Sequence, residues 1–404
     1  MLIAWNTWIT SVGLFQHKLG GTPLASSYEA LLASVFSTTN LATLALFLFA
    51  KQRFSVSFNN AAKVGFGLVA NATVFAVAIL VARTVADAYV FLDATLLLVA
   101  MSAVAGAMMA SVLALVSSMN PIYVQAINVG QGVAGLVPSI VSLISHVSAP
   151  PPTRPFLVLE AREEVPPTFS SLVPFIVSIG LSVVSLVGLA YLPRHSSSLE
   201  GFSEIVDSDR EDEELNAPSV DNSTQLKRIL WDTKEYSFSI FWDFVVTLAV
   251  FPALTVSIQS VRQADPDASR IFKDLFTPIM FIVFNLGDLF GKFLPGLSAF
   301  LITSPQRLLR LSLARTLFVP LLLLCNMPLN SGGGSSLLPR VFGDAEFMFL
   351  VFTIGLTNGW VASNVFMVGP ASAGAGTEGV AADGLVFWMT VGLAVGGGLS
   401  NFFV

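Results

Sequence analysis

Apolar segments long enough to cross a lipid bilayer recur along this chain, and this repetition restricts the fold more than any other feature. A helix of about 20 apolar residues spans the hydrocarbon core of a bilayer, and a helix satisfies its own backbone hydrogen bonds there. The expected spans lie near residues 1–15, 30–50, 63–85, 93–118, 122–147, 169–192, 236–260, 272–300, 306–328, 344–368 and 379–403. The sequence therefore predicts an all-α, polytopic membrane protein with eleven transmembrane helices.

The composition supports the same class and leaves little room for metal or redox chemistry. Apolar residues make up 54% of the chain and charged residues 11%, against roughly 25% charged residues in soluble domains. The single cysteine, Cys325, lies in an apolar run, and the three histidines are far apart in the sequence. Neither a disulfide framework nor a set of metal ligands is visible. We expect no metal, no cofactor and no nucleic-acid partner.

One hydrophilic segment divides the chain into two groups of spans. It runs from Pro193 to about Lys234 and contains the acidic stretch DSDREDEEL, which is too polar to be buried. We therefore expect an N-terminal six-helix half (residues 1–192), a disordered acidic loop (193–234) and a C-terminal five-helix half (235–404). More lysines and arginines flank the spans on the side of this loop, which predicts a cytoplasmic loop. The first span is short, so we expect the natural chain to begin further upstream.

An acid and a base stand inside the apolar run FIVFNLGDLFGK. Asp288 and Lys292 lie one helical turn apart, and Asn285 and Phe281 belong to the same helix face. One charged side chain at the centre of a membrane span costs about 2.5–3.5 kcal/mol, which an ion pair and a water-filled pathway would offset. The stripe therefore indicates either a pair that lines a substrate pathway or a structural ion pair between helices, and both interpretations remain open.

Small residues recur at spacings that let helices pack closely. Gly392 and Gly396 form a small-xxx-small pair in the last span, and the fifth span contains Gly130, Gly132 and Gly135. We expect close helix contacts at these positions. The sequence has no GxxxxGK[ST] loop, so pumping driven by ATP is not expected.

Six segments of this sequence carry a family resemblance: AWNTWIT (4–10), GQGVAG (130–135), FPALTV (251–256), FNLGDLFGK (284–292), LARTLFVPLLLLCN (313–326) and TNGWVAS (357–363). They resemble equilibrative nucleoside transporters (solute carrier family 29), most of all their fungal members. The resemblance implies the six-plus-five arrangement of a major-facilitator-like fold, and facilitative transport of nucleosides by alternating access rather than enzyme activity. It also implies a multi-pass protein in a plasma membrane or in a vacuolar or lysosome-like membrane, and we expect a monomer.

The resemblance also implies a substrate site. Trp5 matches a tryptophan near the nucleobase, and Asp288 matches the acid that accepts hydrogen bonds from ribose hydroxyls. Lys292 stands where the family usually has arginine, which keeps the charge but loses the planar fork. Met109 stands where several members have a glutamine that reads the base. The implied site positions, with Phe281 added from the helix stripe, are Trp5, Asn6, Ile9, Met109, Phe281, Asn285, Asp288, Lys292 and Leu393.

Other functions compete with this interpretation. A major-facilitator-type carrier of another small polar solute would have a similar architecture, and proton-coupled nucleoside symport through Asp288 or Asp243 is a further alternative. An intramembrane aspartyl protease would need two carboxylates that share one proton. Position 285 is asparagine where the GxGD pattern requires glycine, and Pro252 precedes Asp288 where the protease PAL motif follows its second aspartate. The sequence therefore argues against the protease.

Overall fold

The structure is a computed structural model, and it is an assembly of helices joined by turns. It describes residues 2–11, 15, 18–19, 22, 28–54, 60–117, 120–148, 169–195, 222–327 and 340–400, and no β-strand occurs among them. Of the segment 193–234, which the sequence predicts to be a disordered loop, the acidic stretch 207–215 lies outside the described residues. Residues 222–232 form a helix, so the prediction is wrong for that part. The all-α prediction is confirmed for the part of the chain that the structure describes.

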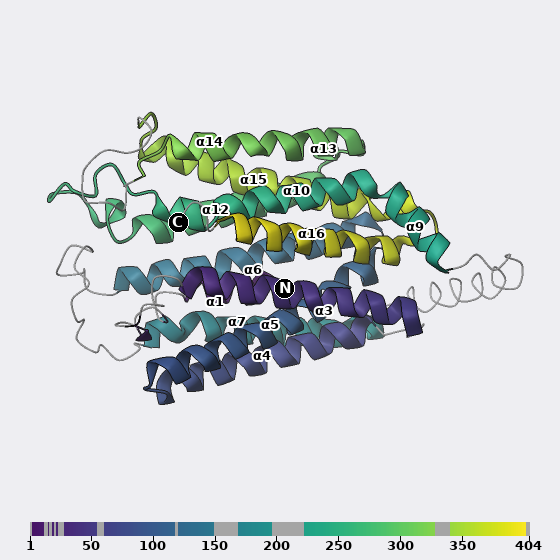
Figure 1. Cartoon of the computed structure of the whole chain (residues 1–404), viewed down its shortest axis with the longest axis horizontal. Coiled ribbons are helices and arrows are strands. Elements are labelled where there is room, and N and C mark those ends of the chain that lie inside the picture. The colour runs from purple at the N-terminus through teal and green to yellow at the C-terminus, as the bar shows by residue number, and fades with distance from the viewer. Residues whose placement is uncertain are drawn as a thin grey trace, which may run out of the picture.

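The helices before residue 196 and those after residue 221 occupy different parts of the molecule. Figure 1 shows α1 to α7 in the lower part of the view and α10 to α15 in the upper part, with α16 between them. The first group comprises α1 (Leu2–Thr10), α3 (Tyr28–Phe54), α4 (Asn60–Thr84), α5 (Ala88–Val116), α6 (Pro121–Ser148) and α7 (Phe169–His195).

The second group begins with a short helix outside the bundle. Figure 1 shows this helix, α9, at one end of the molecule. Helices of this group are α9 (Asn222–Asp232), α10 (Lys234–Val250), α11 (Ala253–Ser257), α12 (Phe276–Phe293), α13 (Pro305–Ala314), α14 (Phe318–Leu323), α15 (Asp344–Val368) and α16 (Glu378–Ser400). Short 3-10 turns are η1 (Arg270–Phe272), η2 (Leu294–Gly296), η3 (Ser298–Phe300), η4 (Arg315–Leu317) and η5 (Pro370–Ala373).

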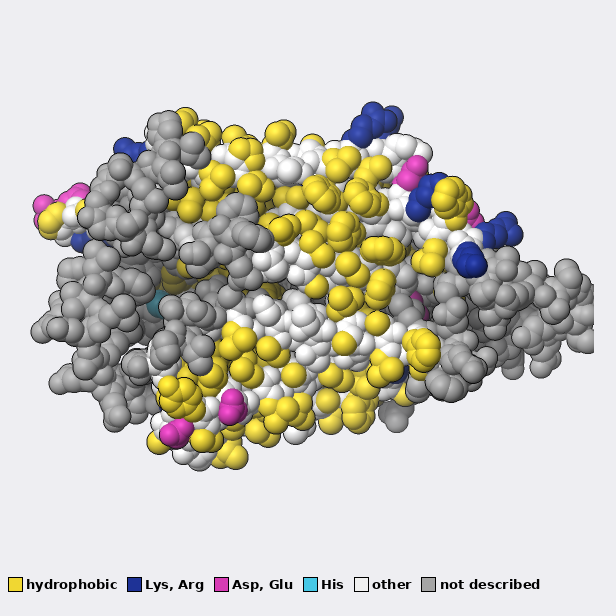
Figure 2. Space-filling view, in the orientation of Figure 1, with side chains coloured by type: hydrophobic (Ala, Val, Ile, Leu, Met, Phe, Trp, Pro, Cys, Tyr) yellow, Lys and Arg dark blue, Asp and Glu magenta, His cyan; other side chains and the backbone are white. Residues whose placement is uncertain are grey.

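Eight helical segments among the described residues are long and apolar enough to cross a membrane. Figure 2 shows hydrophobic side chains over the middle of the visible face, with lysine, arginine, aspartate and glutamate gathered toward its two ends. This distribution is that of a multi-pass membrane protein. The eight segments are 60–84, 88–116, 121–148, 172–190, 234–257, 276–296, 344–373 and 378–400, and a shorter apolar helix covers 34–47.

Residues at the helix boundaries explain where two of these helices begin. The side chain of Asp87 accepts hydrogen bonds from the backbone N–H groups of Tyr89 and Val90, at 3.0 and 2.9 Å, and so caps α5. Helix α6 begins at Pro121, whose missing N–H costs nothing in the first turn. Asn120 caps the same helix by accepting a hydrogen bond from the N–H of Ile122 at 3.1 Å.

The closest helix packing joins α12 to α15 through paired glycines. A Cβ atom added to Gly287 or Gly291 would collide with backbone carbonyls of α15, and one added to Gly355 or Gly359 with carbonyls of α12. Each helix thus presents a GxxxG pair to the other, which lets their backbones approach. This close approach places Asp288, whose own carbonyl lies against Gly359, beside the polar side chains of α15.

The glycines that the sequence singled out behave in two ways. Gly392 and Gly396 of α16 face the carbonyls of Phe241 and Val245 in α10 with no room for a Cβ atom, so close packing there is confirmed. A Cβ atom added to Gly130 would meet no other atom within 4 Å, so the prediction of tight packing at this position is wrong. Because nothing packs against this position of α6, Gly130 does not bring two helices together.

Three larger apolar clusters of buried side chains fill the described bundle. The first is built from residues 4–175 and the third from residues 250–354. The second combines side chains of α5 and α6 with side chains of α10, α13, α15 and α16. Most apolar contacts therefore stay within one group of helices, and the second cluster joins the two groups.

Candidate functional site

The acid and the base predicted from their spacing form a buried ion pair. Lys292 Nζ lies 2.7 Å from Asp288 Oδ2, and the two side chains are 3% and 8% exposed. Both residues lie on the face of α12 that meets α15, because the intervening Gly291 and the preceding Gly287 bring these helices together. The predicted contact between Asp288 and Lys292 is confirmed.

Helix α15 supplies a partner for the second oxygen of this carboxylate. The side-chain amide of Asn358 donates a hydrogen bond of 2.7 Å from Nδ2 to Asp288 Oδ1. Asn358 itself is buried. Asp288 is therefore held from two sides, by a cation on its own helix and by an amide on the neighbouring one, which compensates for its removal from water.

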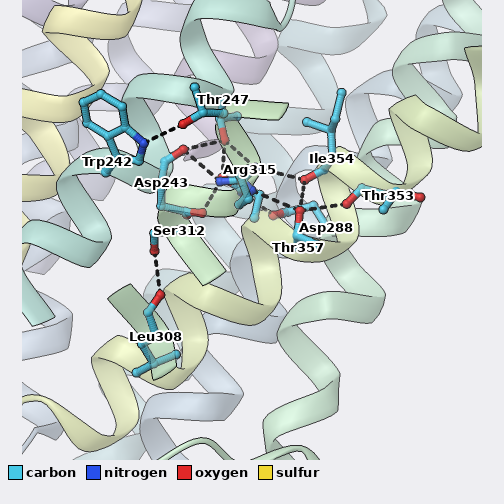
Figure 3. Close-up of polar contacts among 12 residues, drawn as sticks. Trp242, Asp243, Thr247, Asp288, Leu308, Ser312, Arg315, Thr353, Ile354 and Thr357 are labelled. Carbon is cyan, nitrogen blue, oxygen red and sulfur yellow. Dashed lines mark hydrogen bonds and ion pairs between the residues drawn. The ribbon is translucent and has the colours of Figure 1, made fainter. Parts of the chain in front are cut away.

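The polar network continues from Asn358 into α10. The Thr247 hydroxyl lies 2.8 Å from Asn358 Oδ1 and accepts a hydrogen bond of 2.8 Å from Arg315 Nη2. Figure 3 shows Thr247 and Asp243 of α10 pointing toward Arg315, with Asp288 on the other side of the guanidinium. One connected set of hydrogen bonds thus runs from Lys292 through Asp288, Asn358 and Thr247 to Arg315.

Arg315, at the start of η4, is 1% exposed and has a partner for every N–H of its guanidinium. Nη1 donates to the carboxylate and to the backbone carbonyl of Asp243, the latter at 2.8 Å. The other partners are the Thr247 hydroxyl, the Ile354 carbonyl at 3.1 Å and the Thr357 hydroxyl at 3.0 Å. Such a guanidinium is fixed in position.

Sequence reasoning missed most of this network. Arg315 received no role, although its side chain is buried and donates hydrogen bonds to α10 and α15. Asn358 and Thr247 received no role. The available signals were an arginine inside the apolar segment LARTLFVPLLLLCN and an asparagine beside a glycine of a GxxxG pair.

The two buried aspartates have separate cations. Asp288 pairs with Lys292, and Asp243 pairs with Arg315. The second oxygen of Asp243 has no hydrogen-bond partner within the described ranges. A protease dyad shares one proton between adjacent carboxylates, and this arrangement, with a cation on each, is different.

Asn285 and Asn6 meet at a glycine of α6. Asn285 Nδ2 donates to the Ser139 hydroxyl and to the Phe281 carbonyl, both at 2.9 Å. A Cβ atom on Gly135 would collide with the Asn285 amide and would lie 3.3 Å from Asn6 Nδ2. The predicted residues Asn6 and Asn285 therefore come together where α1, α6 and α12 converge, and Gly135 is tightly packed as expected.

The apolar members of the predicted site lie around α1. Trp5 is half-buried, and its ring centroid lies 5.3 Å from that of Phe36. Trp5 and Phe281 pack against the first apolar cluster, and Trp5 and Leu393 against the second. Ile9 is buried in the first cluster. Trp5 thus lies between the first and second clusters and Phe281 between the first and third, whereas Leu393 packs against the second alone.

Two other residues pack within the first helix group. Met109 packs with Val64 and Leu68 of α4 in a small separate cluster. Trp8 is fully buried against the rings of Phe15, Phe75 and Phe175. Trp8 is therefore a core residue of the first helix group.

Comparisons with known proteins place this chain in a known family. A family model described as Nucleoside transporter matches residues 95–404. Equilibrative nucleoside transporter 1 of Homo sapiens is 25% identical over 448 residues, which covers 100% of this chain and 94% of that protein.

Relatives from a plant and a fungus are also similar. Equilibrative nucleotide transporter 1 of Arabidopsis thaliana is 23% identical over 100% of this chain and 83% of its own length. Nucleoside transporter FUN26 of Saccharomyces cerevisiae is 33% identical over 41% of this chain and 32% of its own length. Because the family model covers most of the sequence, this chain belongs to the nucleoside transporter family.

Proposed function

We propose that this protein carries nucleosides across a membrane, down their concentration gradient, and that Asp288 is the acceptor for ribose hydroxyls. It is a multi-pass membrane carrier and not an enzyme. The observation that carries the site assignment is the buried ion pair of Asp288 and Lys292, which lies on α12 one turn beyond Asn285.

The chemistry of a nucleoside fits these groups. Its ribose offers hydroxyls, which both donate and accept hydrogen bonds, whereas a carboxylate only accepts and an ammonium only donates. Each oxygen of Asp288 has one partner, Lys292 or Asn358, and a carboxylate oxygen has a lone pair left for a second donor. Ribose hydroxyls can therefore bind Asp288 and Lys292 without breaking the existing contacts.

The nucleobase is flat and largely apolar on its faces. Trp5, Phe281 and Leu393 are half-buried against the apolar clusters, and we assign the base to this region, with Ile9 beneath it. Aromatic and apolar contacts favour a flat ring with little selectivity for its edges. Asn6 and Asn285 supply polar groups nearby, and Met109 is left out of this assignment because it packs against α4.

The proposed architecture has eleven spans. Besides the eight segments, three further ones support it: α1, α3 with its shorter apolar stretch 34–47, and the continuous run from α13 through η4 to α14. We assign residues 1–192 and 235–404 to two halves that rock about the site, with residues 193–234 as a cytoplasmic loop between them. We propose that the carrier acts as a monomer in a plasma membrane or a vacuolar or lysosome-like membrane.

Uptake into proteoliposomes tests this function. The purified protein is reconstituted, and uptake of labelled uridine and adenosine is measured with and without a pH gradient. Equal uptake in both conditions, and exchange of internal for external nucleoside, is the expected result. Uptake only when a pH gradient is imposed would indicate proton-coupled symport, and uptake of sugars or other polar solutes in preference to nucleosides would contradict the proposal.

A further inference from the structure

A side chain outside the predicted site holds Asp288 from the neighbouring helix, and its orientation is fixed by groups still further away. We propose that Asn358 is a positioning residue for substrate binding, and that Thr247 and Arg315 set the direction of its amide. The inference rests on the proposed role of Asp288 in binding ribose. It gives three residues a role in transport that the sequence analysis did not assign to them.

The first step is how Asn358 reaches Asp288. Its neighbour Gly359 lies so close to α12 that an added Cβ atom would collide with the backbone carbonyl of Asp288. A short side chain on α15 therefore reaches the carboxylate, and the hydrogen bond from Nδ2 to Oδ1 is 2.7 Å long. Hydrogen bonds to an ionised group are stronger than those between neutral groups.

The second step is the orientation of the Asn358 amide. A carboxylate only accepts hydrogen bonds, so the amide nitrogen must face Asp288 and the amide oxygen must face the other way. That oxygen is buried and needs a donor. The donor is the Thr247 hydroxyl of α10, 2.8 Å away.

The third step is the direction of the Thr247 hydrogen. The hydroxyl has a single hydrogen and two acceptors at 2.8 Å, the amide oxygen of Asn358 and the backbone carbonyl of Asp243. The Asp243 carbonyl also receives a hydrogen bond from Arg315 Nη1, while Arg315 Nη2 donates to the Thr247 oxygen itself. Arg315 thus donates one hydrogen bond to the Asp243 carbonyl oxygen and one to the Thr247 hydroxyl oxygen. The hydrogen of Thr247 is left to donate to the amide oxygen of Asn358.

These contacts predict what the network does for transport. With Asn358 in place, Oδ1 of Asp288 is held by α15 and Oδ2 by Lys292, so the free lone pairs of the carboxylate have fixed directions. Without it, the carboxylate is held by the flexible lysine side chain alone and can rotate. Substrates that use Asp288 should lose affinity, and substrates without ribose hydroxyls should not.

Thr247 allows a matched test because two substitutions differ only in the hydroxyl. Thr247→Val keeps the branched shape and removes the donor, whereas Thr247→Ser keeps the donor. In proteoliposomes, we expect Thr247→Val and Asn358→Ala to raise the KM for uridine by roughly ten-fold, in the range of a hydrogen bond to a charged group. The KM for 2′,3′-dideoxyuridine should stay within about two-fold, since without these hydroxyls the bond to Asp288 is absent. Thr247→Ser should restore most of the affinity for uridine.

The possible outcomes separate the proposals. If the KM values for both substrates rise alike, or if only the amount of folded protein falls, the residues are structural and the positioning role is wrong. If Thr247→Ser is as impaired as Thr247→Val, the hydroxyl has no role and the inference fails. Failure of the proposed transport function would look different from failure of the positioning role, because the unaltered protein itself would then transport no uridine.

Discussion

Removing the guanidinium of Arg315 should destabilise the folded protein more than most single substitutions. Arg315→Met keeps an unbranched, apolar stem but leaves Asp243 buried without its cation, and Asp243 is 0% exposed. Breaking a buried ion pair by removing one partner costs about 3–5 kcal/mol. The hydroxyls of Thr247 and Thr357 and the carbonyl of Ile354 also lose a donor.

A double substitution separates the charge from the lost hydrogen bonds. Asp243→Asn removes the buried charge with little change in shape, so Arg315→Met combined with Asp243→Asn should recover roughly half of the loss, or about 2 kcal/mol. The hydrogen bonds that Arg315 makes to Thr247, Thr357 and Ile354 are not recovered, which is why the rescue stays partial.

Thermal unfolding of the substrate-free protein in detergent, followed by tryptophan fluorescence, measures the effect. The unaltered protein, the two single variants and the double variant form one cycle. We expect Arg315→Met to be the least stable of the four, with the double variant between it and the unaltered protein. A single variant as stable as the unaltered protein, or a double variant no better than Arg315→Met, would refute a stabilising ion pair in the bundle.

Three further predictions follow from packing and topology. Gly359→Ala should cost about 1–3 kcal/mol because its Cβ atom would meet the Asp288 carbonyl, whereas Gly180→Ala in α7, which has open space, should cost nothing measurable in the same unfolding assay. Trp8→Ala should destabilise the protein by about 3–5 kcal/mol because its side chain is fully buried, whereas Trp5→Ala should mainly lower nucleoside uptake per folded molecule. Equal effects of both on stability would contradict this division. The glycosylation sequon Asn222-Ser223-Thr224 lies at the start of α9 and should carry no glycan in a eukaryotic host, since segment 193–234 is assigned to the cytoplasm. A glycosidase-sensitive shift on a gel would overturn that orientation.

Hydropathy was enough to predict an all-α membrane protein, and local spacing was enough to predict the central ion pair. Eight helical segments among the described residues are long and apolar enough to cross a membrane, whereas the sequence predicts eleven spans. A long apolar run specifies a membrane helix almost independently of its neighbours, and a spacing of one turn brings Asp288 to Lys292 within a single helix. Breaks within helices were harder to predict. The span expected at 236–260 is divided at Phe251 and Pro252, where α10 ends and α11 begins.

The rest of the network depends on contacts between helices that are distant in the sequence. Thr247 and Asn358 are separated by 111 positions, and Asn358 and Asp288 by 70. A single sequence gives no register between such helices. The paired glycines of α12 and α15 carried a usable signal, because two GxxxG patterns indicate helices that approach closely, but this signal does not say which helix packs against which.

The central claim is that Asp288 binds the ribose of the substrate. Its most direct test is uptake by Asp288→Asn, measured per folded molecule for uridine and for free uracil. We expect uridine transport to fall about ten- to hundred-fold, since hydrogen bonds to a charged group contribute about 1.5–3 kcal/mol. Uracil transport, where present, should fall far less because uracil has no ribose. A proportionate loss for both substrates would contradict the ribose assignment and would leave Asp288 and Lys292 as a structural ion pair.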